Sequence, residues 1–286
     1  MPSVTGEIQA EFAVRSGLTQ LVHKYHASPL KIAKTFRYEN DSLTLDTPPA
    51  EQLGVYMMDC SPGLMSGDHY EITMRLREGA RVFLTNQSFT KVHPSVAGSG
   101  STQRQTLHLE AGALLEYIPE PLMLYKEANL AAEMEVHLAP GSALILSDVL
   151  CPGRTQRGEI FHYTRYTNRL KVWHANELIF YQNQRIEPAA MPLAAPGCWE
   201  HETHLGNLYV YSDRLKHQHL EALMECLVTL NGESSHVRVG ASLTHKYGLI
   251  VSVLGRHAWE VQVALSKAWH EIRRTLFALT PLMVHK

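Results

Sequence analysis

Oxygen-bearing side chains recur at matching positions beyond three glycine turns of this 286-residue chain. The turns share the pattern Leu-x-x-Gly followed by a small residue, and their glycines are Gly79, Gly112 and Gly141. Seven or eight residues after each glycine comes a polar side chain, and these are Gln87, Glu120 and Asp148. If the three units stack in register, the polar side chains arrive at one end of the stack as a polar column.

Thr85, Lys91 and Arg154 lie close in sequence to these side chains, and we expect them beside the polar column. Burying charged groups costs free energy unless each is paired. One interpretation is structural, in which salt bridges and turn caps fix the layers. The other is functional, in which oxygen ligands line a hydrated interior path for a divalent cation. The residues alone leave both interpretations open.

Common enzyme signatures are missing from the sequence. There is no P-loop and no Gly-x-Ser-x-Gly nucleophile elbow. The stretch from His201 to His204 is one residue short of the zinc-protease pattern. A hydrolase that uses Glu120 and Asp148 as general acid and base is an alternative. We expect instead that the chain is not an enzyme.

The 17 histidines and four cysteines are not spaced like the ligands of a permanent metal site. The cysteines are far apart, and no Cys-x-x-Cys pair occurs. His217 and His219 point to nearly opposite sides of an expected helix, because they are two residues apart. We expect no permanent metal site and no permanently bound cofactor, while transient contacts with nickel stay open because imidazole suits that ion.

The elements that must position the polar column are strands. In residues 69–77, apolar side chains alternate with polar ones, which is the period of a half-buried strand. Glycine supplies the positive φ that a tight turn needs. The recurrence at intervals of 33 and 29 residues favours stacked β layers, with three unrelated hairpin turns as the alternative. We predict a mainly β fold with an elongated, β-helix-like body of stacked sheets.

The last third of the chain has helical periodicity. We expect helices at 214–230 and 257–276, with a buried strand at 247–254 between them. Arg273 and Arg274 fall in the last turn of the second helix, where the helix dipole favours cations. The prediction is a single domain, 1–286, in which a helix–strand–helix part (206–286) packs on a β body (1–205).

Composition and charge exclude several classes of partner. Charged residues make up 19% of the chain and the formal net charge is -2, which predicts neither nucleic-acid nor membrane binding. The N-terminus lacks a basic start followed by an apolar run, and no apolar stretch is long enough to cross a bilayer. We therefore expect a cytoplasmic protein.

Four ordered motifs resemble the UreD family of urease accessory proteins, called UreH in some bacteria. They are Ser-Gly-Asp-His-Tyr at 66–70, Leu-Thr-Asn-Gln-Ser-Phe-Thr-Lys-Val at 84–92, Leu-Glu-Tyr-Ile-Pro-Glu-Pro at 115–121, and the stretch 147–159. The resemblance extends to the apolar run 248–255 and to the closing helix.

This resemblance implies a role in urease maturation. Members of the family are scaffolds that bind apo-urease and a helical accessory protein, UreF, after which the nickel-carrying GTPase UreG joins. The family is thought to carry an internal channel that helps pass nickel to the urease active site, so transient Ni(II) is the implied cargo. The residues that match the family's polar positions are Asp68, Lys91, Glu120, Asp148, Arg154 and Glu159. A purely structural interaction module without a metal path is the alternative.

Overall fold

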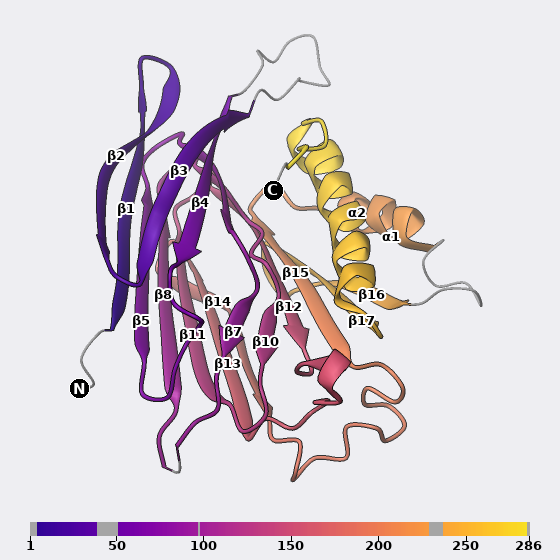
Figure 1. Cartoon of the computed structure of the whole chain (residues 1–286). Coiled ribbons are helices and arrows are strands. Elements are labelled where there is room, and N and C mark those ends of the chain that lie inside the picture. The colour runs from indigo at the N-terminus through magenta and orange to yellow at the C-terminus, as the bar shows by residue number, and fades with distance from the viewer. Residues whose placement is uncertain (1–4, 39–50, 97, 229–236, 285–286) are drawn as a thin grey trace.

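Two facing β-sheets form the body of the protein, and two helices cover the outer face of one of them (Figure 1). The computed structural model describes residues 5–38, 51–96, 98–228 and 237–284. This architecture confirms the prediction of a mainly β, stacked body with two C-terminal helices.

The first sheet has seven strands within the described residues. In spatial order they are β14 (Glu177–Ile186), β13 (Arg165–His174), β11 (Asn129–Leu138), β8 (Ser101–Leu109), β5 (His69–Leu76), β1 (Gly6–Arg15) and β2 (Leu18–Ala27). The five neighbours from β13 to β1 run parallel to one another.

The second sheet has ten strands within the same described ranges. Its main path is β16 (Val237–Leu243), β17 (Gly248–Gly255), β15 (His204–Ser212), β12 (Ala143–Cys151), β9 (Leu114–Tyr117), β6 (Arg81–Asn86), β4 (Gln52–Asp59) and β3 (Leu30–Tyr38). Two short strands complete it, β7 (Thr90–Val92) and β10 (Leu122–Leu124), which pair with each other.

The chain alternates between the two sheets as it winds, and the three predicted glycine turns make one side of each layer. Gly79, Gly112 and Gly141 all have positive φ, at 68°, 68° and 76°. A Cβ on Gly112 would lie 3.8 Å from Gly79, and one on Gly141 would lie 3.7 Å from Gly112. The turns are therefore stacked in register. The parallel pairing of the strands that follow them excludes three unrelated hairpins.

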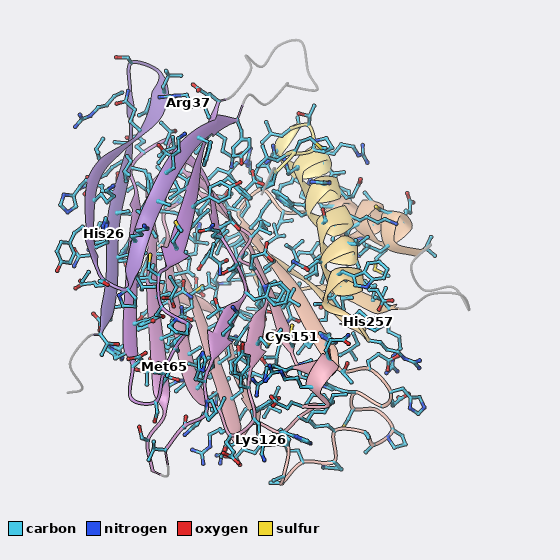
Figure 2. The ribbon with its side chains drawn as sticks, viewed as in Figure 1. His26, Arg37, Met65, Lys126, Cys151 and His257 are labelled. Atoms are coloured by element: carbon cyan, nitrogen blue, oxygen red, sulfur yellow. The ribbon has the colours of Figure 1, made fainter. Side chains whose placement is uncertain are left out.

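Alternation along each strand sends one set of side chains between the sheets and the other set outward. On β12, Leu144 and Leu146 belong to the core between the sheets, while Ile145 and Val149 belong to a second core under the helices. Because β12 is covered on both faces, it reads as a nearly continuous apolar run. Figure 2 shows the side chains that fill the space between the layers.

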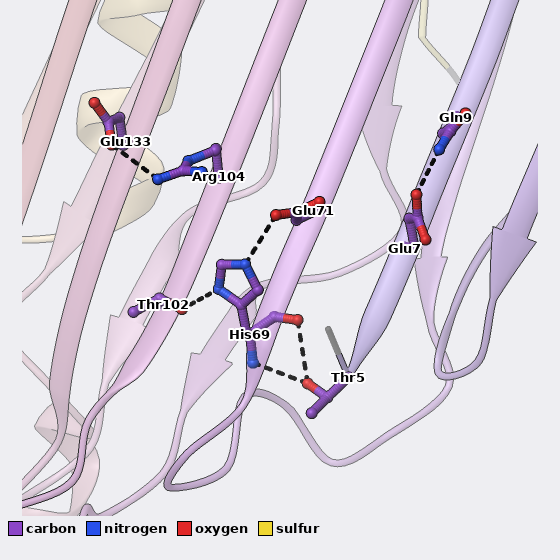
Figure 3. Close-up of polar contacts among 8 residues, drawn as sticks. All are labelled: Thr5, Glu7, Gln9, His69, Glu71, Thr102, Arg104 and Glu133. Carbon is purple, nitrogen blue, oxygen red and sulfur yellow. Dashed lines mark hydrogen bonds and ion pairs between the residues drawn. The ribbon is translucent and has the colours of Figure 1, made fainter. Parts of the chain in front are cut away.

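The outer face of the first sheet carries paired polar side chains (Figure 3). His69 bonds the Glu71 carboxylate at 3.0 Å and also contacts the Thr102 hydroxyl. Glu133 accepts a hydrogen bond of 3.0 Å from the Lys171 ammonium and lies 3.8 Å from the Arg104 guanidinium. These charges face away from the space between the sheets and stabilise the parallel ladder.

The helices are α1 (His217–Leu227) and α2 (Ala258–Phe277), and a short 3₁₀ helix, η1, spans Thr155–Arg157. The second predicted helix is confirmed within a residue or two at each end. The first begins three residues later than predicted, with Lys216 at its N-cap, and its expected end at 230 lies outside the described residues. In the part of the chain that the structure describes, neither helix is long and apolar enough to cross a membrane.

The C-terminal part is not a separate helix–strand–helix unit packed on the body, because its strands belong to the second sheet. The expected division at 205 falls inside β15, which pairs antiparallel with β12, and β17 and β16 continue the same sheet. The predicted strand at 247–254 is confirmed as β17. The α2 helix lies against β12, β15 and β17, so it covers one face of the second sheet.

Candidate functional site

A cavity of about 170 Å³ lies between the two sheets. The first sheet contributes polar side chains from three of its strands, namely Gln103, Gln105, Tyr166, Asn168 and Gln184. The second sheet and its loops contribute charged and polar groups, namely Asp59, Lys91, Glu120, Asp148 and Asn207. An interior core of apolar side chains therefore contains a wide polar interruption.

Asp148 projects into this cavity because of its place in β12. It follows Leu144 and Leu146 in the row that faces the first sheet, where the other members are buried and apolar. Asn207 stands opposite it on β15 and donates a 2.9 Å hydrogen bond from Nδ2 to Asp148 Oδ1. Ser252 donates in turn to Asn207 Oδ1 at 2.8 Å. This row of polar side chains runs from the cavity across β15 to the exposed Ser252 on β17.

Asp148 is partly buried in the sheet and lines the cavity. Enclosure raises its pKa from 3.8 to about 6, because a desolvated carboxylate is less stable than the neutral acid. The hydrogen bonds from Asn207 and Tyr209 oppose this pKa shift and leave it smaller than burial alone would make it. At neutral pH the group is therefore mainly an ionised carboxylate that accepts hydrogen bonds from Asn207 and Tyr209.

The cavity reaches solvent near the loop between β6 and β7. Gln87, Ser88 and Lys91 are exposed there, and all three line the cavity. Asp59 lies at the same mouth, where its carboxylate accepts a 3.1 Å hydrogen bond from the Tyr70 hydroxyl. Among the described lining residues there are three carboxylates and one ammonium group, so the formal charge of the lining is −2. Such a lining attracts cations.

Lys91, Glu120 and Asp148, together with Gln87, are thus brought to one cavity as the stacked arrangement predicts. The other members of the predicted column do not line it. Asp68 closes a tight turn, since its Oδ2 accepts a 2.7 Å hydrogen bond from the Met65 amide.

Thr85 lies on the opposite face of its strand. It follows Leu84, which faces the first sheet, so alternation sends Thr85 toward the helices. Its hydroxyl donates to the Ile118 carbonyl at 2.7 Å, and the residue is fully buried. Its role is to hold the segment before Glu120 against β6.

Arg154 and Glu159 form a separate pair on the loop beyond β12. The Arg154 guanidinium donates to both carboxylate oxygens of Glu159, one bond being 2.7 Å long, and lies 4.2 Å from the Tyr125 ring centroid. The hydrogen bond from Arg154 lowers the pKa of Glu159. Because the two charges satisfy each other outside the cavity, neither joins the path that the polar column predicts.

Sequence reasoning missed the half of the lining that the first sheet contributes. Gln103 and Gln105 occupy positions of β8 that share a face with the buried Leu107 and Leu109. A polar side chain in such a row has to face either a partner or a cavity. Here the Tyr117 hydroxyl donates to Gln105 at 3.0 Å, and the remaining polar surface lines the cavity. Two glutamines in a row of otherwise apolar, inward-facing positions were the sequence signal that could have predicted this part of the lining.

The oxygen donors of the cavity come from separate elements of the fold. Within the described residues, no group of three or more His, Cys, Asp or Glu side chains is placed to hold a metal ion together. Glu120 and Asp148 instead offer single carboxylates, separated by amide and hydroxyl oxygens. Oxygen donors of this kind suit hard divalent cations.

Comparison with known proteins connects this architecture to one family. A model of the family "UreD urease accessory protein" matches residues 4–284. The chain is 33% identical to the urease accessory protein UreD of Acetivibrio thermocellus, over 85% of this chain and 87% of that protein. It is 32% identical to the protein of the same name from Lysinibacillus sphaericus, over 78% and 80%.

A third relative, the urease accessory protein UreD of Lachnoclostridium phytofermentans, aligns over the full length of both chains at 27% identity. The relatives are named as accessory proteins, which are not enzymes themselves. The resemblance found in the motifs is thereby confirmed. The chain belongs to the UreD family of urease accessory proteins.

Proposed function

We propose that this protein is a cytoplasmic scaffold for urease maturation and that its between-sheet cavity is a conduit for Ni(II) on the way to the urease active site. The observation that carries the proposal is the position of two carboxylates, Glu120 and Asp148, in one cavity inside a β body. Desolvation raises the pKa of the Asp148 carboxyl to about 6, so a cation beside this carboxylate would be stabilising. A transient divalent cation would offset part of that desolvation cost.

The chemistry of the lining supports passage. An ion moves through a conduit only if each site binds it well enough to admit it and weakly enough to release it. Single carboxylates among Gln, Asn and Tyr oxygens meet that condition, because they replace only part of the ion's hydration shell. Lys91 at the mouth balances part of the negative charge and so limits the residence of the ion.

The scaffold role rests on the family and on the surfaces of the fold. We propose that apo-urease and the helical protein UreF bind the chain directly, and that the GTPase UreG joins through the complex. Two elements carry exposed apolar side chains suited to such docking, with Trp259 62% exposed on α2 and Met224 39% exposed on α1. No nucleic acid or membrane partner is proposed.

Filling the cavity tests the conduit. Ala132 lines the cavity from β11, whereas its neighbour Ala131 is exposed on the outer face of the same strand. We expect Ala132→Phe to slow nickel incorporation into urease by about tenfold or more, equivalent to about 1.4 kcal/mol added to a barrier. Ala131→Phe adds the same ring outside the cavity and should leave the rate unchanged. The measurement is nickel content of urease against time, by atomic absorption.

Co-purification with urease and UreF verifies that both Phe variants assemble. A wild-type rate for an assembled Ala132→Phe protein would show that nickel does not pass between the sheets. In that case the interaction-module alternative, in which the polar cavity is structural, would replace the conduit.

A further inference from the structure

A second cavity, of about 160 Å³, lies on the other side of the second sheet, beneath α2. Gln262, Ser266 and Trp269 of α2 form its outer wall. Four residues line both this cavity and the one between the sheets, and they are Pro119, Glu120, Ser147 and Val149. The two cavities therefore lie back to back across the thickness of the sheet.

The sheet is open at this point because its hydrogen-bond ladder is interrupted. Parallel pairing between β9 and β12 ends at Tyr117 and Leu146, and pairing between β10 and β12 resumes at Leu122 and Leu150. In between lies the segment 118–121, in which prolines stand on both sides of Glu120. Proline has no amide hydrogen, so Pro119 and Pro121 cannot donate to β12.

The same segment stays attached on its other side. The Ile118 amide donates to the Leu84 carbonyl at 2.9 Å, and the Glu120 amide donates to Asn86 Oδ1 at 2.6 Å. The Thr90 amide donates to the Pro121 carbonyl at 3.0 Å. The interruption is thus confined to the side of the segment that faces β12. The hydrogen bonds on the other side fix the segment in place.

Glu120 lies in this opening and is held from the helix side. Gln262 on α2 donates from Nε2 to Glu120 Oε2 at 3.4 Å, a long bond between residues 142 positions apart. The amide of Gln262 also carries an oxygen that can ligate a cation. A single side chain of α2 is therefore positioned to hold the carboxylate or to share an ion with it.

We propose that this opening is a gate between the two cavities, with Gln262 as the gating residue, through which a hydrated divalent cation crosses the second sheet to or from the face covered by α2. This proposal rests on the proposed conduit and specifies where the ion crosses the second sheet. When Gln262 bonds Glu120, the opening is occupied. When that bond breaks, the Glu120 carboxylate and the Gln262 carbonyl oxygen together receive the ion.

Charge at the gate provides the first test. Gln262→Lys places an ammonium beside Glu120, which neutralises the carboxylate and repels the ion. We expect nickel incorporation into urease to slow by about tenfold or more, because like charges a few ångströms apart repel strongly at a partly buried site. Gln9→Lys makes the same exchange beside another carboxylate, Glu7, on the outer face of the first sheet and should transfer nickel at the wild-type rate.

Volume at the gate provides a second, independent test. Ser266→Phe fills the cavity under α2, whereas Ala131→Phe adds the same ring on the outer face of the first sheet. Ser266→Phe should slow nickel incorporation about tenfold, and Ala131→Phe should not. Each variant is measured in the complete assembly with NiSO₄ as the nickel source, after co-purification has shown that it binds its partners.

The Ala132→Phe protein is measured alongside these variants to separate two failures. If Ala132→Phe slows transfer while Gln262→Lys and Ser266→Phe do not, the conduit stands and the gate is wrong. If none of the three slows transfer, the conduit itself is wrong. Slow transfer by both gate variants, with normal Gln9→Lys and Ala131→Phe proteins, is the result the gate requires.

Discussion

Replacing Asp148 with Asn is expected to make the folded protein more stable at neutral pH and at the same time to slow nickel transfer. The enclosed carboxyl has a pKa of about 6 against an ordinary 3.8, so the folded state pays a desolvation cost once the group ionises. Asn is neutral at every pH and its side-chain oxygen still accepts the hydrogen bond from Asn207. The stabilisation at neutral pH is up to about 3 kcal/mol, from the pKa difference.

The pH dependence fixes the sign of this effect. Because the folded pKa lies above the unfolded one, the contribution of Asp148 is fully favourable below pH 3.8 and is lost as the pH rises through about 6. The unfolding free energies of wild type and Asp148→Asn should therefore converge below about pH 4, separate between about pH 4 and 6, and differ by a constant amount above about pH 6. Urea unfolding across that range measures the difference, and nickel content of urease measures the loss of transfer.

A matched carboxylate outside the cavity serves as control. Asp213 accepts a 2.7 Å hydrogen bond from the Gly141 amide at the glycine-turn side of the stack. Asp213→Asn should leave nickel transfer unchanged. If Asp148→Asn instead destabilised the protein at pH 7.5 and transferred nickel normally, Asp148 would be a structural residue and not a conduit ligand.

Replacing Arg273 with Met is expected to destabilise the protein by about 3–5 kcal/mol. Arg273 of α2 and Glu116 of β9 form an ion pair in which both side chains are fully buried. Gln52 donates to the same carboxylate at 3.0 Å, and Trp269 donates to it from Nε1. Removing the guanidinium leaves a buried carboxylate without a cation and breaks a polar contact between α2 and the sheet.

The neighbouring residue supplies the control. Arg274 is exposed and pairs with Glu271 on the surface of the same helix turn. Arg274→Met should cost about 0.2–1 kcal/mol, the range for exposed pairs. Adding Glu116→Gln to Arg273→Met removes the uncompensated charge while keeping an acceptor for Trp269, so it should recover much of the loss. Equal urea midpoints for the two single variants would contradict the buried-pair account.

Local sequence signals predicted the stacked body and its closing helix. The glycines at 79, 112 and 141 identified turns that do stack, because positive φ at a fixed offset from each strand is a local requirement. Strand alternation in residues 69–77 and helical periodicity in 257–276 are likewise local. Those elements appear in the structure close to their predicted positions.

Pairings between distant segments were beyond the reach of those signals. The sequence predicts Arg273 in the last turn of its helix, where the helix dipole favours a cation. In the structure its side chain is buried against Glu116, 157 residues away. β15 closes against β12 by antiparallel pairing, which the C-terminal helix–strand–helix prediction omitted. Nothing in either segment alone specifies which partner it meets.

The candidate site was predictable in part for the same reason. Regular offsets from the glycine turns brought Glu120 and Asp148 to one cavity. Proximity in sequence also suggested Thr85 and Arg154, but strand alternation turned Thr85 to the other face and the Glu159 pair held Arg154 on a loop. The offset from a glycine turn predicts in which layer a side chain lies. Whether the side chain reaches the cavity depends on the face of the strand that carries it and on its local partners.

The most direct test of the conduit is the position of the ion itself. Crystals of the protein in its complex with apo-urease and UreF, soaked in NiSO₄, can be measured on both sides of the nickel absorption edge. The account predicts an anomalous peak between the two sheets, in contact with the carboxylate of Asp148 or Glu120. Nickel found only on the outer faces of the sheets, with the cavity holding nothing but water, would contradict it.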